Sequence, residues 1–226
     1  MARKFATVLL TLALPTIAFA QYGPRYPARP GYGPRPFGPT LSAWVGVGGP
    51  GGRISDEGDG ELGDVVHHQF PLGLGLSYRF NPFFRAGPFF EAAPLSMADG
   101  ACAPGDPCGG NDFRFGLDAQ VHFAPYRHAD PWLGLGIGYE WLNFDATGCL
   151  DSGCFAERFH YSGLLFPKLS FGVDFALSPM ATLGPYLSYS GGQYSHVETT
   201  SAGSQSINDQ AFHGWLELGI RGNFNF

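Results

Sequence analysis

The chain has 226 residues, of which 34 are glycine and 19 are proline, and only 14% of its side chains are charged. This composition excludes a coiled coil or helical bundle, which is built from Ala, Glu, Lys, Leu and Arg, and glycine lacks the three-residue period of collagen. The net charge of −6 argues against a nucleic-acid-binding protein, which leaves a β-rich domain with glycine in its strands and loops.

Residues 1–20 have the plan of a secretory signal peptide. Arg3 and Lys4 provide a positive start, residues 5–14 are mostly apolar, and Ala18-Phe19-Ala20 ends the segment with small residues at the cleavage positions. A membrane anchor is the alternative, but the apolar run is shorter than the roughly 20 residues that span a bilayer. We therefore expect export and cleavage after Ala20.

Residues 21–40 form a proline-rich tail with arginines at positions 25, 29 and 35. Such a segment should be extended, with polyproline character and little packing. It is either a spacer or a basic arm that contacts an anionic polymer or membrane surface. Peptidoglycan is one candidate polymer.

From residue 41 the apolar side chains recur with period two, which predicts β-strands. The clearest stretch is 72–80, where leucines, a tyrosine and a phenylalanine alternate with Gly, Ser and Arg. No helical period competes with this alternation. We predict eight strands, at residues 41–48, 67–80, 83–96, 112–125, 131–146, 160–177, 181–197 and 211–226.

The connections between these strands alternate in length. The second, fourth and sixth are short, whereas the others run to 13 residues or more by these boundaries. Outer-membrane β-barrels have short periplasmic turns, long external loops and an even strand number. The predicted fold is therefore an all-β, eight-stranded antiparallel up-and-down transmembrane β-barrel over residues 41–226.

The polar faces of the predicted strands carry five basic and five acidic residues. In a membrane barrel these faces line the lumen, where a balanced set of charges can pair. The ten residues are Arg79, Arg85, Glu91, Arg114, Asp118, Glu140, Lys168, Asp174, Glu217 and Arg221. The same faces hold Trp44, Trp132, Phe166 and Trp215, whereas Leu165 falls on the lipid face. An eight-stranded lumen is narrow enough for these side chains to fill, although the many small inward residues would permit a thin water path.

The last strand ends in an aromatic residue, Phe226, with Phe224, Ile220, Leu218 and Leu216 on the same face. In this the chain resembles small eight-stranded bacterial outer-membrane proteins of the OmpA or OmpX type. The resemblance implies that Phe226 is the signal read by the barrel-assembly machinery, and that outer-membrane lipid and lipopolysaccharide surround the barrel. OmpA has a C-terminal peptidoglycan-binding domain, whereas we predict no such domain in this chain.

Four cysteines, Cys102, Cys108, Cys149 and Cys154, fall in two predicted external loops. An even count in an exported chain predicts disulfides, and pairing within each loop (102–108 and 149–154) needs no long-range docking. A zinc site is the alternative, but the spacings do not match the usual fingers.

Two further loop features are candidate ligand sites. The acidic segment 55–64 does not have the spacing of an EF-hand, which makes a solvated loop the better interpretation. Histidines near the outer strand ends could form a metal or pH-sensing cluster. They are His67, His68, His160, His196 and His213. We predict no metal, no cofactor and no nucleic-acid partner.

An enzymatic interpretation rests on His160-Tyr161-Ser162, which resembles the His-x-Ser pair of lipid A 3-O-deacylases, with Asp174 as the acid. Twelve residues of one strand span about 40 Å at about 3.3 Å each, whereas a triad needs hydrogen-bond contact. We therefore predict no catalytic residue. The expected function is a non-enzymatic envelope or surface-contact barrel. The alternatives are a narrow channel, a lipid A-modifying enzyme and a soluble exported barrel that binds an apolar ligand.

Overall fold

The computed structural model describes residues 37–54, 61–98, 109–150 and 153–226, and at 146–150 and 153–156 it describes the backbone. The elements in this part of the chain are nearly all β. They are β1 (Gly38–Gly52), α1 (Leu62–Val65), β2 (Val66–Gln69), β3 (Leu72–Asn81), β4 (Phe84–Met97), β5 (Gly110–His122), β6 (Ala129–Leu150), β7 (Gly153–Ala176), β8 (Ala181–Thr199), β9 (Gly203–Ser206) and β10 (His213–Asn225). None of the helices in these ranges is long and apolar enough to cross a membrane.

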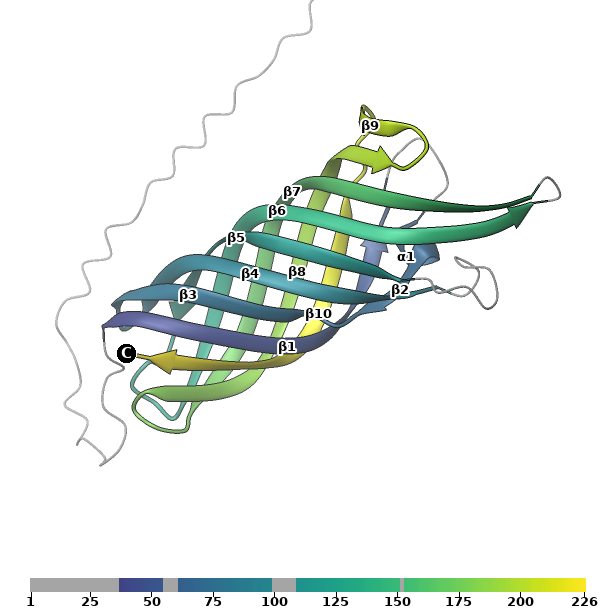
Figure 1. Cartoon of the computed structure of the whole chain (residues 1–226). Helices are drawn as coiled ribbons and strands as arrows, with labels where there is room; N and C mark the ends of the chain where they lie inside the picture. Colours follow the sequence, from purple (N-terminus) through teal and green to yellow (C-terminus); the bar gives the residue numbers. More distant parts are fainter. Residues whose placement is uncertain (1–36, 55–60, 99–108, 151–152) are drawn as a thin grey trace, which may run out of the picture.

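The strands close into one antiparallel barrel (Figure 1). β1 pairs with β10 from Thr40↔Asn225 to Gly52↔His213, and β10 pairs in turn with β8. β2 and β3 both lie between β1 and β4, so they form one wall strand, and β9 folds back on the end of β8. The ring therefore has eight strands, which confirms the predicted fold class.

The two ends of the barrel differ in their connections. At one end the chain turns within residues 82–83, 123–128 and 177–180, and the end of β10 lies beside the start of β1 (Figure 1). Local side chains stabilise these turns: the Phe83 amide donates to Asn81 Oδ1 at 2.8 Å, and the Ala181 amide donates to Ser178 Oγ at 3.0 Å. At the other end, β6 and β7 project beyond the barrel as a long hairpin.

Three local details differ from the predicted elements. The predicted strand 67–80 is divided at Phe70-Pro71, where proline supplies no amide hydrogen to the ladder. The predicted loop 147–159 is strand, because β6 and β7 stay paired up to Leu150↔Gly153. α1 and β9 were not predicted, because elements of four residues carry too little periodicity.

The outer wall of the barrel is apolar. Leu72, Leu74 and Leu76 are each more than half exposed, although they alternate with positions that face inward. The same holds around the ring, with many Leu, Phe, Val and Ile side chains exposed. A soluble barrel places such side chains inside, so the soluble interpretation is wrong for this distribution.

Aromatic pairs occur along the apolar wall. Near the short turns the rings of Phe83 and Tyr126 lie 6.0 Å apart, and towards the other end those of Phe90 and Phe113 lie 6.4 Å apart. About ten residues separate Phe113 from Phe123, or about 33 Å at about 3.3 Å per residue. A tilt of about 40° reduces this length to about 25 Å, the usual height of the apolar band of membrane barrels.

Strand β7 reverses its faces once. Its register with β8 shifts between Leu165 and Lys168, where β7 has one extra residue, whereas the extra residue at the shift between Ser162 and Gly163 lies in β8. Before the reversal Leu165 faces the lumen and is fully buried, whereas Phe166 is 50% exposed on the outer wall. The predictions for these two residues were therefore wrong, because an extra residue in a strand exchanges the two faces.

Candidate functional site

The candidate site is the barrel lumen, which is filled by charged and aromatic side chains. Nine of the ten charges singled out in the sequence are buried, and Asp118 is half-buried. Four further Asp and His side chains are buried beside these charges: Asp112, His122, Asp130 and His213. Asp112 and His122 lie on the same face of β5 as Arg114, so the alternation of side chains could have predicted that they face the lumen. His213 lies at the strand end where the sequence places it, but its side chain is buried rather than exposed to water.

Arg114 is the centre of a cluster in the half of the lumen away from the short turns, which we call the outer half. Its guanidinium donates to Glu91 at 2.8 Å and to Gln69 at 2.9 Å, and it also pairs with Asp112 and Glu217. All of these side chains are almost completely buried. A carboxylate or guanidinium in this position is tolerated only because the others compensate its charge.

Glu91 links this cluster to the middle of the lumen. Its second oxygen accepts hydrogen bonds from Trp44 Nε1 at 2.7 Å and Lys168 Nζ at 3.1 Å. The Lys168 ammonium also lies 4.7 Å from the centre of the Phe89 ring. Aromatic side chains therefore take part in the charge network rather than only filling space.

A second cluster occupies the half near the short turns. Arg221 donates to Gln120 at 2.9 Å and pairs with Asp174 at 3.3 Å. Arg85 donates to the same Gln120 oxygen at 2.7 Å. The guanidinium of Arg221 also stacks 3.5 Å from the Trp132 ring. This half of the lumen is therefore as closely connected as the outer half.

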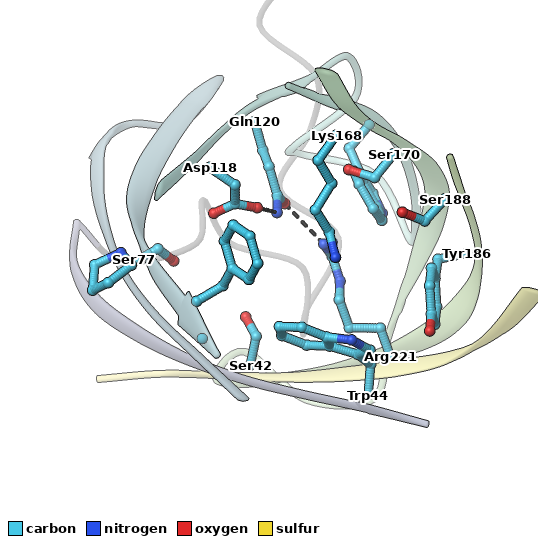
Figure 2. Close-up of a pocket in the computed structure, with 14 residues that line it drawn as sticks. Ser42, Trp44, Ser77, Asp118, Gln120, Lys168, Ser170, Tyr186, Ser188 and Arg221 are labelled. Atoms are coloured by element: carbon cyan, nitrogen blue, oxygen red, sulfur yellow. Dashed lines mark hydrogen bonds between the residues drawn. The ribbon is translucent and has the colours of Figure 1, made fainter. Parts of the chain in front are cut away.

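Between the two clusters lies a cavity of about 40 Å³. Figure 2 shows Asp118, Gln120, Lys168 and Arg221 pointing into it, with serines and Trp44 around them. A water molecule needs about 10–15 Å³, so this space holds about three. Buried hydroxyl groups on its wall, such as Ser188 Oγ, have no hydrogen-bond partner among the described residues, and waters there would satisfy them.

An apolar cap lies over the lumen at the end opposite to the short turns. Its buried residues come from α1, β2, β6, β8 and β10: Leu62, Val66, Leu142, Phe144, Tyr194 and Trp215. Beneath it, Glu140 accepts hydrogen bonds from Trp215 Nε1 at 2.8 Å and Tyr194 Oη at 3.1 Å, and it lies 3.0 Å from His213 Nε2. Periodicity could not reveal this cap, since its parts are far apart in the chain.

Only one of the two predicted cysteine pairs lies within the described residues. Cys102 and Cys108 lie outside the described residues. Cys149 and Cys154 are direct partners in the β6–β7 ladder. Opposite residues in antiparallel strands have Cα atoms about 4.5–5.5 Å apart, which is within the range that a disulfide spans.

The candidate triad is not assembled. Ser162 and Asp174 lie on the same strand, β7, without a turn between them, and Asp174 pairs with Arg221 in the other half of the barrel. His160 is hydrogen-bonded to Asn143 instead. In the part of the chain that the structure describes, no group of three His, Cys, Asp or Glu residues could hold a metal. Most of the acidic segment 55–64 lies outside these ranges.

No known protein-family profile matches the chain, and no curated protein matches its sequence. Solved structures do match. The outer membrane protein OprG from Pseudomonas aeruginosa is 15% identical, with a TM-score of 0.52 over 86% of this chain and 99% of that one. Neisserial surface protein A is also 15% identical, with a TM-score of 0.50 over 83% of this chain and 97% of that one.

The fold is that of a small outer-membrane β-barrel. At this level of identity the likeness concerns architecture, and one architecture can host unrelated functions. The activity therefore depends on the lumen, the outer wall and the loops of this particular chain.

Proposed function

We propose that the chain is an integral outer-membrane β-barrel without enzymatic activity, which supports envelope integrity or presents its loops for surface contact. The observation that carries this proposal is the distribution of side chains. A continuous apolar wall faces outward, whereas nearly all the strand charges are paired inside. In a bilayer this wall contacts lipid acyl chains, whereas in a soluble protein the same apolar surface would be unfavourably exposed to water.

The lumen is proposed to be closed to ions. An ion that crossed it would have to pass the apolar cap, the Arg114 cluster and the two tryptophans beside the cavity. Space for about three waters in the middle does not replace a hydration shell along that path. Bilayer conductance tests this: wild-type protein should give no channel events above the background, whereas regular unitary steps would favour the narrow channel.

The enzymatic alternative is not favoured, because Ser162 and Asp174 are held in opposite halves of the barrel. Mass spectrometry of lipid A from cells with and without the protein tests this directly. Unchanged lipid A is the expected result. Loss of an acyl chain that depends on Ser162 would contradict the proposal.

The partners follow from the orientation of the barrel. The short turns and Phe226 would face the periplasm, where the aromatic end of β10 is available to the barrel-assembly machinery. Phe226 is exposed, its amide donates to the Pro39 carbonyl at 3.0 Å, and its ring contacts Phe224. The tail at 21–40 would then lie in the periplasm, close to peptidoglycan, and the removed signal peptide would end at Ala20.

The disulfides are proposed to brace the external loops. Peptide mapping without reduction should find Cys149 joined to Cys154, as the register of the hairpin favours, and Cys102 joined to Cys108. Closing the six-residue ring should stabilise the hairpin tip by about 2 kcal/mol. A cross-loop connection, such as Cys102 to Cys149, would contradict this pairing.

Fractionation and gel mobility test the main proposal. We expect the protein in the outer-membrane fraction and faster migration in an unheated sample than in a boiled one, because the closed barrel resists detergent. A soluble periplasmic protein without a heat-dependent shift would overturn the proposal.

A further inference from the structure

The fully buried side chains of the lumen include one more acid than base. Four carboxyl groups and two bases lie in the outer half: Glu91, Asp112, Glu140, Glu217, Arg114 and Lys168. Three bases and two carboxyl groups lie in the half near the short turns: Arg79, Arg85, Arg221, Asp130 and Asp174. The outer half therefore lacks two positive charges, and the other half offsets only one of them. An uncompensated charge in a buried position is costly, so one further positive charge is needed in the outer half.

Two carboxyl oxygens mark the place of the missing charge. Asp112 Oδ1 and Glu217 Oε2 are buried and have no hydrogen-bond partner among the described residues. Both oxygens of Glu91, by contrast, accept hydrogen bonds. An ionised carboxylate oxygen without a donor bears the full cost of desolvation, whereas a proton on the group removes its charge. Asp112 and Glu217 are therefore the candidates for holding a proton.

The guanidinium of Arg114 holds both candidates in one cluster. It pairs with Asp112 through Nη2 and with Glu217 through Nη1. Glu91 Oε1 lies 2.8 Å from Nη1, and Glu140 Oε1 lies 3.9 Å from Nε. The phenols that face these acids carry no charge at neutral pH, and they belong to Tyr186 and Tyr194. Four carboxyl groups crowded around one guanidinium favour a proton on one of them.

We propose that Asp112 and Glu217 form a proton-binding site, which holds one proton in the folded barrel. The inference goes beyond the proposed function, because it follows from the composition of the lumen alone. In the unfolded chain both carboxyl groups lose their protons above about pH 4. The folded barrel therefore binds one proton more than the unfolded chain at neutral pH, and its stability falls as the pH rises. The site makes the closed barrel more stable in acidic than in alkaline surroundings.

Urea unfolding of the full-length barrel in phospholipid vesicles, repeated from about pH 5 to about pH 8, tests the proposal. The unfolding constant of the wild type should rise about tenfold more per pH unit than that of Asp112→Asn, because the amide replaces the protonated acid. At the alkaline end Asp112→Asn should also be the more stable protein. Glu217→Gln should have the same effect and provides the test if Asp112→Asn does not fold. Asp118→Asn makes the same change on the same strand outside the cluster, and this matched control should keep the wild-type pH dependence.

The two buried histidines are the alternative location of the proton. His122 Nδ1 lies 2.8 Å from Asp130 Oδ2, and His213 Nε2 lies 3.0 Å from Glu140 Oε2. His122→Gln and His213→Gln should keep the wild-type pH dependence, and its loss in either variant would move the proton to an imidazole and overturn the assignment. Equal pH dependence of the wild type and the two carboxamide variants would overturn it as well. So would an unfolding midpoint that rises with millimolar calcium at the alkaline end, since a metal ion would then supply the charge.

Discussion

Arg114 offers the most direct test of the lumen, because it compensates several buried carboxylates at once. Arg114→Met keeps a long side chain of similar reach and removes every donor. Glu91 would keep Trp44 and Lys168 as donors. Asp112 and Glu217 would lose their guanidinium partner inside the barrel wall.

The magnitude follows from this arrangement. Removing one partner of a buried ion pair costs about 3–5 kcal/mol, because the other charge stays without compensation. Since two acids lose a charged donor while Glu91 is partly compensated, we expect a loss of about 4 kcal/mol in the free energy of unfolding. Neutralising the two acids as well, in Arg114→Met/Asp112→Asn/Glu217→Gln, should restore about half of it.

The assay is urea unfolding of the barrel in phospholipid vesicles, followed by tryptophan fluorescence and circular dichroism. The slope of the unfolding free energy with urea should be the same for all three proteins, so that the midpoints report stability. A loss below about 1 kcal/mol for the single variant is the value expected of an exposed ion pair. That result, or a triple variant no more stable than the single one, would refute the reasoning.

Two further predictions concern packing and strand faces. Gly73→Val should destabilise the barrel by several kcal/mol or prevent folding, since a Cβ atom there overlaps the Trp44 indole. The control variant Gly75→Ala should fold normally, because its Cβ atom would lie 3.4 Å from that ring. Equal heat-dependent gel shifts for the two variants would contradict this prediction. Brominated lipid should quench the added fluorescence of Phe166→Trp much more than that of Leu165→Trp, because only position 166 lies on the outer wall. The reverse order would mean that β7 has no face reversal.

The alternation of side chains is a local property, and it accounts for most of what could be predicted. In an unbroken strand such as β5, Phe113 and Phe115 must lie on one face and Arg114 on the other, whatever the neighbours are. The strand number, the lipid-facing wall and the buried position of most charges follow from that rule. The outward direction of the apolar face also follows, because that face is too lipophilic and too aromatic for one ordinary core and because the connections alternate between short and long.

The tertiary structure decided what depends on partners far away in the chain. The face reversal at Leu165 follows from how β7 aligns with β8, and the length of the β6–β7 hairpin follows from continued pairing beyond the barrel. The network around Arg114 and the apolar cap both join segments more than a hundred residues apart. Pairing between distant side chains is set by strand register and barrel closure, neither of which a period-two pattern encodes.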